Sequence, residues 1–350
     1  MQLLYRVLLI LVLPLVFIGG INLGIDPDYT LKKDYIPPLA QALVNGNLVS
    51  GPVNTNSRLL KKDWIRQLPY LPDVLVLGSS RTQPLKKESF PDKMFFNASV
   101  SNCTFQDMYA FINLLEEKDG ELPETIIICA DQWLLGNSFS EKRWLFNRDQ
   151  FVKLYGNIAP NIDYTVPLKW ELQKEWIKEL FSVRYLIRAL RTFGKTEPFV
   201  IEHQIDSSKT MLLPDGSRSL PQKLITASPT EINQLAKDYF YQSKDEQFTE
   251  VSKIQKQLFI DFIRYLQEKS CEVILFLPPY HPETFQLISQ SEKHTGVLKA
   301  ETFFQQFAQQ NNIPILGGTN PAAMNLKADD FYDAVHLKPN TLNCLFKQRD

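Results

Sequence analysis

The stretch Asp73-Val-Leu-Val-Leu-Gly-Ser-Ser-Arg81 joins a continuous apolar run to an abrupt polar turn. A run of this length is typical of a strand that is buried on both faces, as strands of parallel sheets are. Gly78 lets the backbone turn tightly after the strand, and the turn presents two hydroxyl groups. The stretch therefore predicts a buried parallel strand that ends in a serine-bearing turn.

Further apolar runs alternate with helical patterns along the chain. Thr104 paired with Asp107, and the stretch Ser228-Pro-Thr-Glu231, are both signatures of a helix start. Strands that alternate with helices predict right-handed parallel crossovers and an α/β fold, a three-layer α/β/α sandwich around a parallel sheet. The other expected strands are 94–96, 125–130, 273–277 and 313–316.

The chain divides into three parts by composition. Residues 1–25 form an apolar segment, and 26–72 is interrupted by prolines and is interpreted as a connecting segment. The α/β domain occupies 73–350 and carries a helical insertion at about 137–227, which is rich in aromatic and charged residues. Within the insertion, 168–194 is expected to be helical.

The apolar N-terminal segment predicts attachment to a membrane. Val7–Ile25 carries no charge and has about the length of a membrane-spanning helix. Arg6 precedes it, while Asp26 and Asp28 follow it, which favours an extracytoplasmic main domain. We expect a retained signal anchor. A cleaved signal peptide, with Gly19-Gly20 as its cleavage site, and a buried core helix are the alternatives.

Composition bounds the class of protein. The formal net charge of −1 gives no indication of a nucleic-acid surface, and 44% hydrophobic with 22% charged residues is typical of a globular chain. The histidines form no ligand pair at helical spacing, so no metal and no other cofactor is expected. Four cysteines fit neither a zinc site nor a disulfide framework: Cys103, Cys129, Cys271 and Cys344.

Two fragments at opposite ends of the domain supply the parts of a catalytic triad. Ser80 follows the first strand, and Asp333 and His336 lie three residues apart near the C-terminus. A serine hydroxyl needs an imidazole to take its proton and a carboxylate to orient that imidazole. We expect Ser80 as nucleophile, His336 as general base and Asp333 as orienting carboxylate, with Ser79 as the rival nucleophile. An ordinary polar turn and a solvated loop are the alternatives.

Other polar and aromatic residues follow the expected strands, whose carboxyl ends meet at one edge of a parallel sheet. Helical N–H groups after Ser80 are also expected to stabilise an oxyanion. For Trp133 the alternative is a buried structural side chain, and for His281 it is a cap on the helix after Pro282. The candidates for oxyanion stabilisation or substrate binding are Ser79, Arg81, Asn97, Asn102, Asp131, Trp133 and His281.

The order of these blocks resembles the SGNH (GDSL-like) hydrolase superfamily, whose sheet is flavodoxin-like. Within it, the chain resembles the membrane-anchored proteins of cell-envelope and exopolysaccharide O-acetylation. The resemblance implies a triad of Ser80, Asp333 and His336. The first block reads Gly78-Ser79-Ser80 where the superfamily usually has Gly-Asp-Ser.

The second and third blocks depart from the superfamily pattern. Asn102 stands where a glycine of the oxyanion hole is usual, and its backbone N–H can still donate. Cys129-Ala-Asp131-Gln132 stands where Gly-x-Asn-Asp is usual, so Asp131 replaces the expected asparagine donor. A carboxylate at that position repels an oxyanion unless it is protonated or turned away.

The resemblance implies a serine-dependent O-acyl transferase or esterase, in the first place for O-acetyl groups. It would act outside the cytoplasm on a cell-surface polysaccharide or its acyl donor, beside a multi-spanning membrane acyltransferase as partner. The altered third block favours the alternative of a non-catalytic envelope-assembly or polysaccharide-binding protein on a degenerate SGNH scaffold. If the N-terminal segment is a core helix, a soluble intracellular esterase is the third hypothesis.

Overall fold

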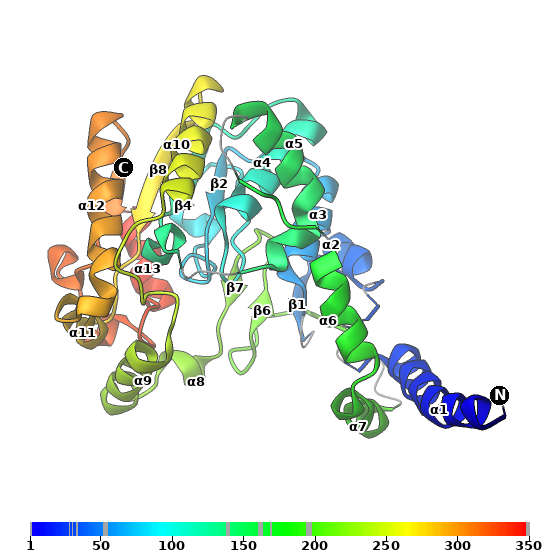
Figure 1. The fold of residues 1–350 in the computed structure, drawn as a ribbon. Coiled ribbons are helices and arrows are strands. Elements are labelled where there is room, and N and C mark those ends of the chain that lie inside the picture. Colours follow the sequence, from blue (N-terminus) through cyan, green and yellow to red (C-terminus); the bar gives the residue numbers. More distant parts are fainter. Residues whose placement is uncertain are drawn as a thin grey trace.

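A five-stranded parallel sheet lies at the centre of the computed structural model (Figure 1), which describes residues 2–27, 29, 31–32, 34–51, 55–137, 141–159, 164–168, 170–193 and 198–347. The strand order is β3-β2-β4-β8-β9, and every neighbouring pair is parallel. This is the doubly wound order 2-1-3-4-5, in which ligands bind at the switch point beside the first strand. The strands are β2 (Val74–Leu77), β3 (Phe95–Asn97), β4 (Thr125–Cys129), β8 (Glu272–Leu277) and β9 (Ile315–Gly317).

The predicted α/β class with a parallel sheet is therefore confirmed. The continuous apolar runs predicted these strands correctly because both faces of the strands are covered. In β2, for example, all four residues are buried. Alternate residues of each strand belong to two separate cores, with Leu75 in the larger one and Val76 in the smaller one.

Helices cover the two faces of the sheet unequally. The larger core packs beneath four long helices: α3 (Ser57–Gln67), α4 (Phe105–Asp119), α10 (Lys253–Glu268) and α12 (Thr295–Gln310). The smaller core is closed by α13 (Pro339–Lys347), through Leu342 and Phe346, and by loop residues such as Leu85 and Phe331. The second helical layer is thus thin, and loops complete it.

A second, antiparallel sheet links the expected connecting segment to the expected insertion. Its order is β5-β1-β6-β7, formed by β1 (Leu48–Ser50), β5 (Val200–Glu202), β6 (Met211–Leu212) and β7 (Arg218–Ser219). Residues 26–72 also form α2 (Ile36–Val44) and α3, whose Trp64 is fully buried. This segment is therefore part of the folded domain as well as a connection.

The remaining helices follow local sequence signals. The predicted starts are confirmed, since both Thr104–Asp107 and Ser228–Glu231 form capping boxes. The stretch 168–194, expected to be helical, forms two helices, and Ser182 caps the second one by accepting a hydrogen bond from the Tyr185 N–H at 3.1 Å. The other helices are α5 (Arg148–Ile158), α6 (Trp170–Leu180), α7 (Val183–Thr192), α8 (Gln222–Ile225), α9 (Pro229–Gln242) and α11 (Pro282–Ser289).

The N-terminal segment forms α1 (Gln2–Ile25), which extends from one corner of the molecule beside α7 (Figure 1). The Asn22 side chain donates hydrogen bonds to the carbonyls of Leu180 at 2.9 Å and Ser182 at 3.0 Å, which docks α1 on the turn between α6 and α7. Within the described residues, none of the helices combines the length and apolar character that crossing a bilayer requires, so the structure does not support the predicted membrane span.

Candidate active site

A continuous hydrogen-bonded chain joins Ser80, His336 and Asp333. Ser80 Oγ lies 2.8 Å from His336 Nε2, and His336 Nδ1 lies 2.8 Å from Asp333 Oδ2. The serine comes from the turn after β2, and the other two residues come from the loop before α13. Ser80 and His336 are 256 positions apart in the sequence. Folding therefore brings together the hydroxyl, the imidazole and the carboxylate that the sequence singled out.

The loop that carries Asp333 and His336 is held at both ends. An isolated antiparallel bridge joins Phe331 to Leu337, and the Tyr332 N–H donates to the His336 carbonyl at 3.1 Å. The Tyr332 ring also stacks on the imidazole, with centroids 5.3 Å apart and planes 7° apart. These contacts fix the plane of the imidazole in line with both of its partners.

The carboxylate of Asp333 is arranged to stay ionised. Its Oδ1 accepts hydrogen bonds from the N–H groups of Val335 and His336, both at 2.9 Å. Burial by itself raises the pKa of Asp333, but the charge and hydrogen bond of His336, together with these two N–H groups, outweigh it and hold the pKa below its usual value. An ionised Asp333 keeps the proton of His336 on Nδ1 and leaves Nε2 free to accept the serine proton.

The turn after β2 differs from the expected strand-to-helix turn. No α-helix follows Ser80: residues 80–84 form turns, and a short 3₁₀ helix, η1 (Lys87–Ser89), comes next. The expectation that helical N–H groups after Ser80 stabilise an oxyanion is therefore wrong. Gly78 is required for close packing: a Cβ there would lie 2.4 Å from Cys129 Cβ and 2.5 Å from Thr82 Oγ1.

Side chains hold this turn in place of a helix. Thr82 Oγ1 donates to the Ser79 carbonyl at 3.2 Å and shares a 2.9 Å hydrogen bond with Ser99 Oγ. The Asn97 amide donates to the carbonyls of Thr82 at 2.8 Å and Leu85 at 2.9 Å. Asn97 is fully buried, its amide is bonded to this turn, and it does not line the cavity beside Ser80, so in this structure it holds the turn.

Ser79 and Ser80 have distinct environments. Ser79 is buried, and its Oγ accepts a hydrogen bond from the Arg81 N–H at 3.2 Å. Both serines line the same cavity, but Ser80 is only partly buried and its hydroxyl is hydrogen-bonded to the imidazole. The geometry thus favours Ser80 over its rival as the nucleophile.

Asn102 lies beside Ser80 on the wall of the same cavity. Its φ of 51° falls in the left-handed region that glycine adopts without strain, which suits the position where the resemblance implies a glycine. Within the described residues, no acceptor receives the backbone N–H of Ser80 or of Asn102. These two N–H groups are the available donors for an oxyanion.

Arg58 anchors the loop that carries Asn102. Its guanidinium donates to the Asn102 carbonyl at 2.8 Å and forms a two-pronged ion pair with Asp107, in which Nε to Oδ1 is 2.8 Å. Arg58 comes from α3, so a residue of the segment interpreted as a connection supports the site. Burial lowers the pKa of this guanidinium, but the Asp107 carboxylate outweighs that effect and raises it above its usual value.

Arg81 and Asp131 belong to a buried charge cluster next to Ser80. Arg81 Nη1 lies 3.4 Å from Asp131 Oδ1, and Arg81 Nη2 lies 3.4 Å from Glu246 Oε1. Tyr239 and Ser243 donate hydrogen bonds to Glu246. Burial raises the pKa of Asp131, although Arg81 acts in the opposite direction. The Asp131 carboxylate thus faces the Arg81 guanidinium, and Asp131 does not line the cavity beside Ser80.

The cavity at Ser80 is small, with a volume of about 140 Å³. Trp133 lines it although only 6% of the side chain is exposed, so it forms part of the wall and part of the core. Sites for drug-sized molecules occupy about 300–1,000 Å³. The space beside Ser80 therefore suits a short acyl group.

His281 caps a helix, as the alternative interpretation holds. Its Nδ1 accepts a hydrogen bond from the Glu283 N–H at 3.2 Å at the start of α11, and its ring is buried against Phe331. Its backbone N–H donates to the Ala334 carbonyl at 3.0 Å, within the loop of Asp333 and His336. Burial lowers the pKa of His281. The residue supports the catalytic loop from outside the cavity.

Three residues of the site escaped the sequence analysis: Arg58, Glu246 and Tyr332. Glu246 lies in the charged stretch Lys244-Asp-Glu246, which has the composition of a solvated loop. Each of the three acts through a partner distant in sequence, and such contacts leave no local pattern. Only the spacing of Tyr332 before Asp333 and His336 offered a signal. Among the described residues, no group of histidine, cysteine or acidic side chains could hold a metal ion.

The class of this protein is defined by its own fold and site geometry. No protein-family model matches the chain, and a search of curated proteins finds no match. The class that fold and site define is a doubly wound α/β protein with a Ser-His-Asp arrangement at the carboxyl edge of its sheet.

Proposed function

We propose that this protein is a serine-dependent O-acyl transferase or esterase of the SGNH type that acts on O-acetyl groups of a cell-surface polysaccharide. The observation that carries the proposal is the chain of two 2.8 Å hydrogen bonds from Ser80 through His336 to Asp333. A serine hydroxyl in this arrangement can be deprotonated as it attacks an ester.

In the first half-reaction Ser80 Oγ attacks the acyl carbonyl and its proton passes to His336 Nε2. The oxyanion that forms accepts hydrogen bonds from the N–H groups of Ser80 and Asn102. Collapse of this tetrahedral intermediate breaks the bond to the leaving oxygen, which takes the proton from His336. The products are an acyl-serine and a free hydroxyl compound.

In the second half-reaction an acceptor hydroxyl attacks the acyl-serine. His336 takes the proton of the acceptor and returns one to Ser80 Oγ as the acyl group leaves. A sugar hydroxyl as acceptor gives acyl transfer, and water gives hydrolysis. The 140 Å³ cavity supports an acetyl group over a long acyl chain.

The apolar surface of α1 and α7 supports a place at a membrane. Exposed apolar residues cover α1 between Ile10 and Phe17, and α7 exposes Val183, Ile187 and Leu190. The sequence of α7 alternates these residues with arginines at 184, 188 and 191, as in helices that lie at a membrane surface. We include in the proposal an anchor through α1, an extracytoplasmic main domain and a multi-spanning acyltransferase that supplies the acyl donor.

The test of the catalytic proposal is covalent labelling and turnover of the purified full chain. Wild type is expected to react with a fluorophosphonate at Ser80, located by mass spectrometry, and to release p-nitrophenol from p-nitrophenyl acetate. Ser80→Ala is expected to lose both activities, while Ser79→Ala keeps its label on Ser80. Transfer of acetyl from the same ester to oligosaccharides, against release as acetate, separates transferase from esterase.

The alternative is a non-catalytic protein that binds or assembles envelope polysaccharide, and the buried ion pair at Asp131 is the observation that favours it. If folded wild type neither labels nor turns over any acetyl ester, and Ser80→Ala leaves the acetyl content of the producing cells unchanged, the acyl-transfer proposal fails and the scaffold role stands.

A further inference from the structure

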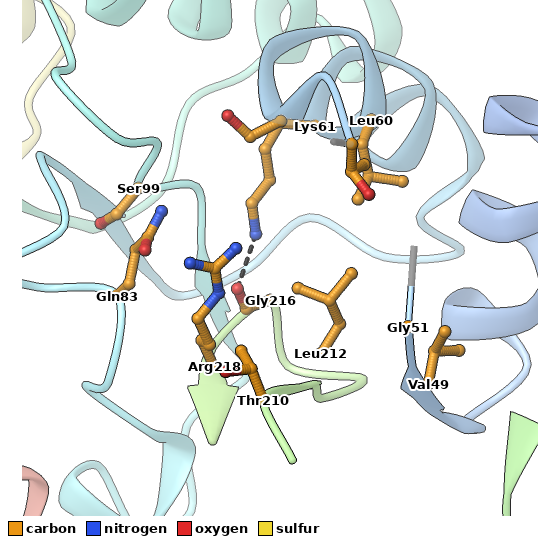
Figure 2. A pocket seen from close by; sticks show the side chains of 12 residues that line it. Val49, Gly51, Leu60, Lys61, Gln83, Ser99, Thr210, Leu212, Gly216 and Arg218 are labelled. Carbon is orange, nitrogen blue, oxygen red and sulfur yellow. Dashed lines mark hydrogen bonds between the residues drawn. The ribbon is translucent and has the colours of Figure 1, made fainter. Parts of the chain in front are cut away.

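A second cavity lies on the other side of the turn that carries Ser80. It has a volume of about 120 Å³ and lies between α3, the antiparallel sheet and the turn residue Gln83 (Figure 2). Two cationic side chains, Lys61 and Arg218, project into it from separate elements.

Lys61 is buried and only partly satisfied. Its ammonium donates hydrogen bonds to the carbonyls of Asn97 at 2.5 Å and Gly216 at 2.6 Å, which leaves one of its three N–H donors without a hydrogen-bond acceptor. The ammonium also lies 4.5 Å from the ring centroid of Trp64 and 5.0 Å from that of Phe96. Burial lowers its pKa to about 7, and the neighbouring charge of Arg218 acts in the same direction. An anion in the cavity would restore the charged form.

Arg218 is partly buried and has no charged partner among the described residues. Its Nε is buried without a hydrogen-bond partner, and no carboxylate of a described residue lies within ion-pair distance of its guanidinium. Burial lowers its pKa. A guanidinium presents five N–H donors in a planar fork that matches carboxylate and phosphate oxygens. In Arg218 the Nε has lost its contact with water and no hydrogen bond offsets that loss, so an anion that accepts from it would stabilise the folded chain.

No acidic residue balances the two cations inside the cavity. Its described lining contains no aspartate and no glutamate. Asp215, whose charge Lys61 does sense, is committed elsewhere, since its carboxylate accepts hydrogen bonds from Ser217 and from the Lys87 N–H at 3.0 Å. The cavity therefore has a surplus of positive charge that an anion would offset.

Polar groups complete the cavity wall. The side-chain amide of Gln83 has no hydrogen-bond partner among the described residues, and Ser99 lies beside it with its hydroxyl bonded to Thr82 (Figure 2). The amide can donate to an oxygen that also receives N–H groups from Lys61 and Arg218. Three donor groups from three separate elements then converge on one compact ligand.

We propose that the Lys61–Arg218 cavity is a binding site for a compact oxyanion, a carboxylate or a phosphate group. The site is separate from the Ser80 cavity, and the inference does not depend on the acyl-transfer proposal. Gln83 and Ser99 contact the turn that carries Ser80. An anion bound in this cavity would therefore stabilise that turn on the side away from the Ser80 cavity.

Titration calorimetry of the full chain with sodium phosphate and with sodium acetate, at fixed ionic strength and with chloride as the background ion, tests this proposal. Wild type is expected to bind one equivalent of at least one of these anions. Phosphate binding alone assigns the site to phosphate groups, and acetate binding alone assigns it to carboxylates. Arg218→Gln is expected to weaken binding by roughly tenfold or more, since a charge-assisted hydrogen bond to an anion is lost.

The control is Arg66→Gln, which removes an exposed arginine from α3 and is expected to bind as wild type does. Arg218→Gln breaks no side-chain hydrogen bond within the described residues, so it should fold, and without anion it should unfold at or above the wild-type temperature. Lys61→Met gives an independent second variant with the same loss of binding. Absence of saturable binding of both anions to wild type, or equal affinity in Arg218→Gln, Lys61→Met and Arg66→Gln, overturns the proposal.

Discussion

Replacing Asp333 by asparagine tests the catalytic geometry most directly, because the structure dictates how the new side chain must sit. Oδ1 of Asp333 accepts two backbone N–H groups at 2.9 Å and lies 3.0 Å from His336 Nδ1, while Oδ2 lies 2.8 Å from the same Nδ1. The carbonyl oxygen of the asparagine must take the Oδ1 position, since an NH₂ there would meet two donors. Its NH₂ group then takes the closer position, 2.8 Å from Nδ1, and repulsion between the two N–H donors favours the tautomer in which Nδ1 accepts and the imidazole proton lies on Nε2.

The expected magnitude follows from this change of tautomer. With its proton on Nε2, His336 cannot take the proton of Ser80 Oγ. The corresponding change in a serine-protease triad lowers kcat about 10⁴-fold, which is about 5.4 kcal/mol at about 1.36 kcal/mol per tenfold. The two backbone hydrogen bonds and the shape of the loop are retained, so we expect little change in the free energy of unfolding.

The assay is the rate of fluorophosphonate labelling of Ser80 together with turnover of p-nitrophenyl acetate at neutral pH. Asp329→Asn is the matched control, because Asp329 is exposed and close in sequence; it is expected to keep the wild-type rate. A folded Asp333→Asn protein that labels and turns over within about tenfold of wild type would refute the role given to Asp333, since loss of a triad carboxylate costs far more.

Three further predictions concern the free energy of unfolding, measured by urea denaturation. Gly78→Ala should cost about 1–3 kcal/mol through overpacking against Cys129, whereas Gly156→Ala, in a helix with nothing within 4 Å, should not destabilise. Arg81→Met should cost about 3–5 kcal/mol because it leaves the buried Asp131 carboxylate without its cation. Adding Asp131→Asn should recover part of that loss. The pKa of Lys61 is lowered to about 7 from an unfolded value near 10.5, so the unfolded chain binds more protons between these values. Wild-type stability should therefore rise from pH 7 to 9 by up to about 1.4 kcal/mol per pH unit relative to Lys61→Met, and equal slopes would contradict the lowering of the Lys61 pKa by burial.

The sequence predicted the parts of the fold that have strong local patterns. The three longest strands of the parallel sheet were found because burial on both faces leaves an uninterrupted apolar run, as at Thr125–Cys129 and Glu272–Leu277. The capped starts at Thr104 and Ser228 were found because the cap itself is a local hydrogen-bond pattern.

The antiparallel sheet could not be predicted in the same way. Its strands have two or three residues each, too few to show an alternating pattern, and β1 pairs with β5 across about 150 residues. The absence of a helix after Ser80 was missed for a different reason. Turn residues predict a turn, but the element that follows depends on contacts with Asn97 and Ser99, which are distant from the turn.

The replacement of the expected asparagine by Asp131 has a physical explanation in Arg81. An aspartate near an oxyanion raises the free energy of the transition state if its charge is exposed to the reaction. Here the carboxylate is fully buried and lies 3.4 Å from the Arg81 guanidinium, so its charge faces a cation; burial raises the pKa of Asp131, and Arg81 acts in the opposite direction. Ordering the turn that carries Ser80 costs about 1–2 kcal/mol per residue in backbone entropy. Because no α-helix follows this turn, side-chain contacts must offset that cost. Asp131 is thus tied to the placement of Arg81 and, through it, of the adjacent Ser80, while the N–H groups of Ser80 and Asn102 remain available to the oxyanion.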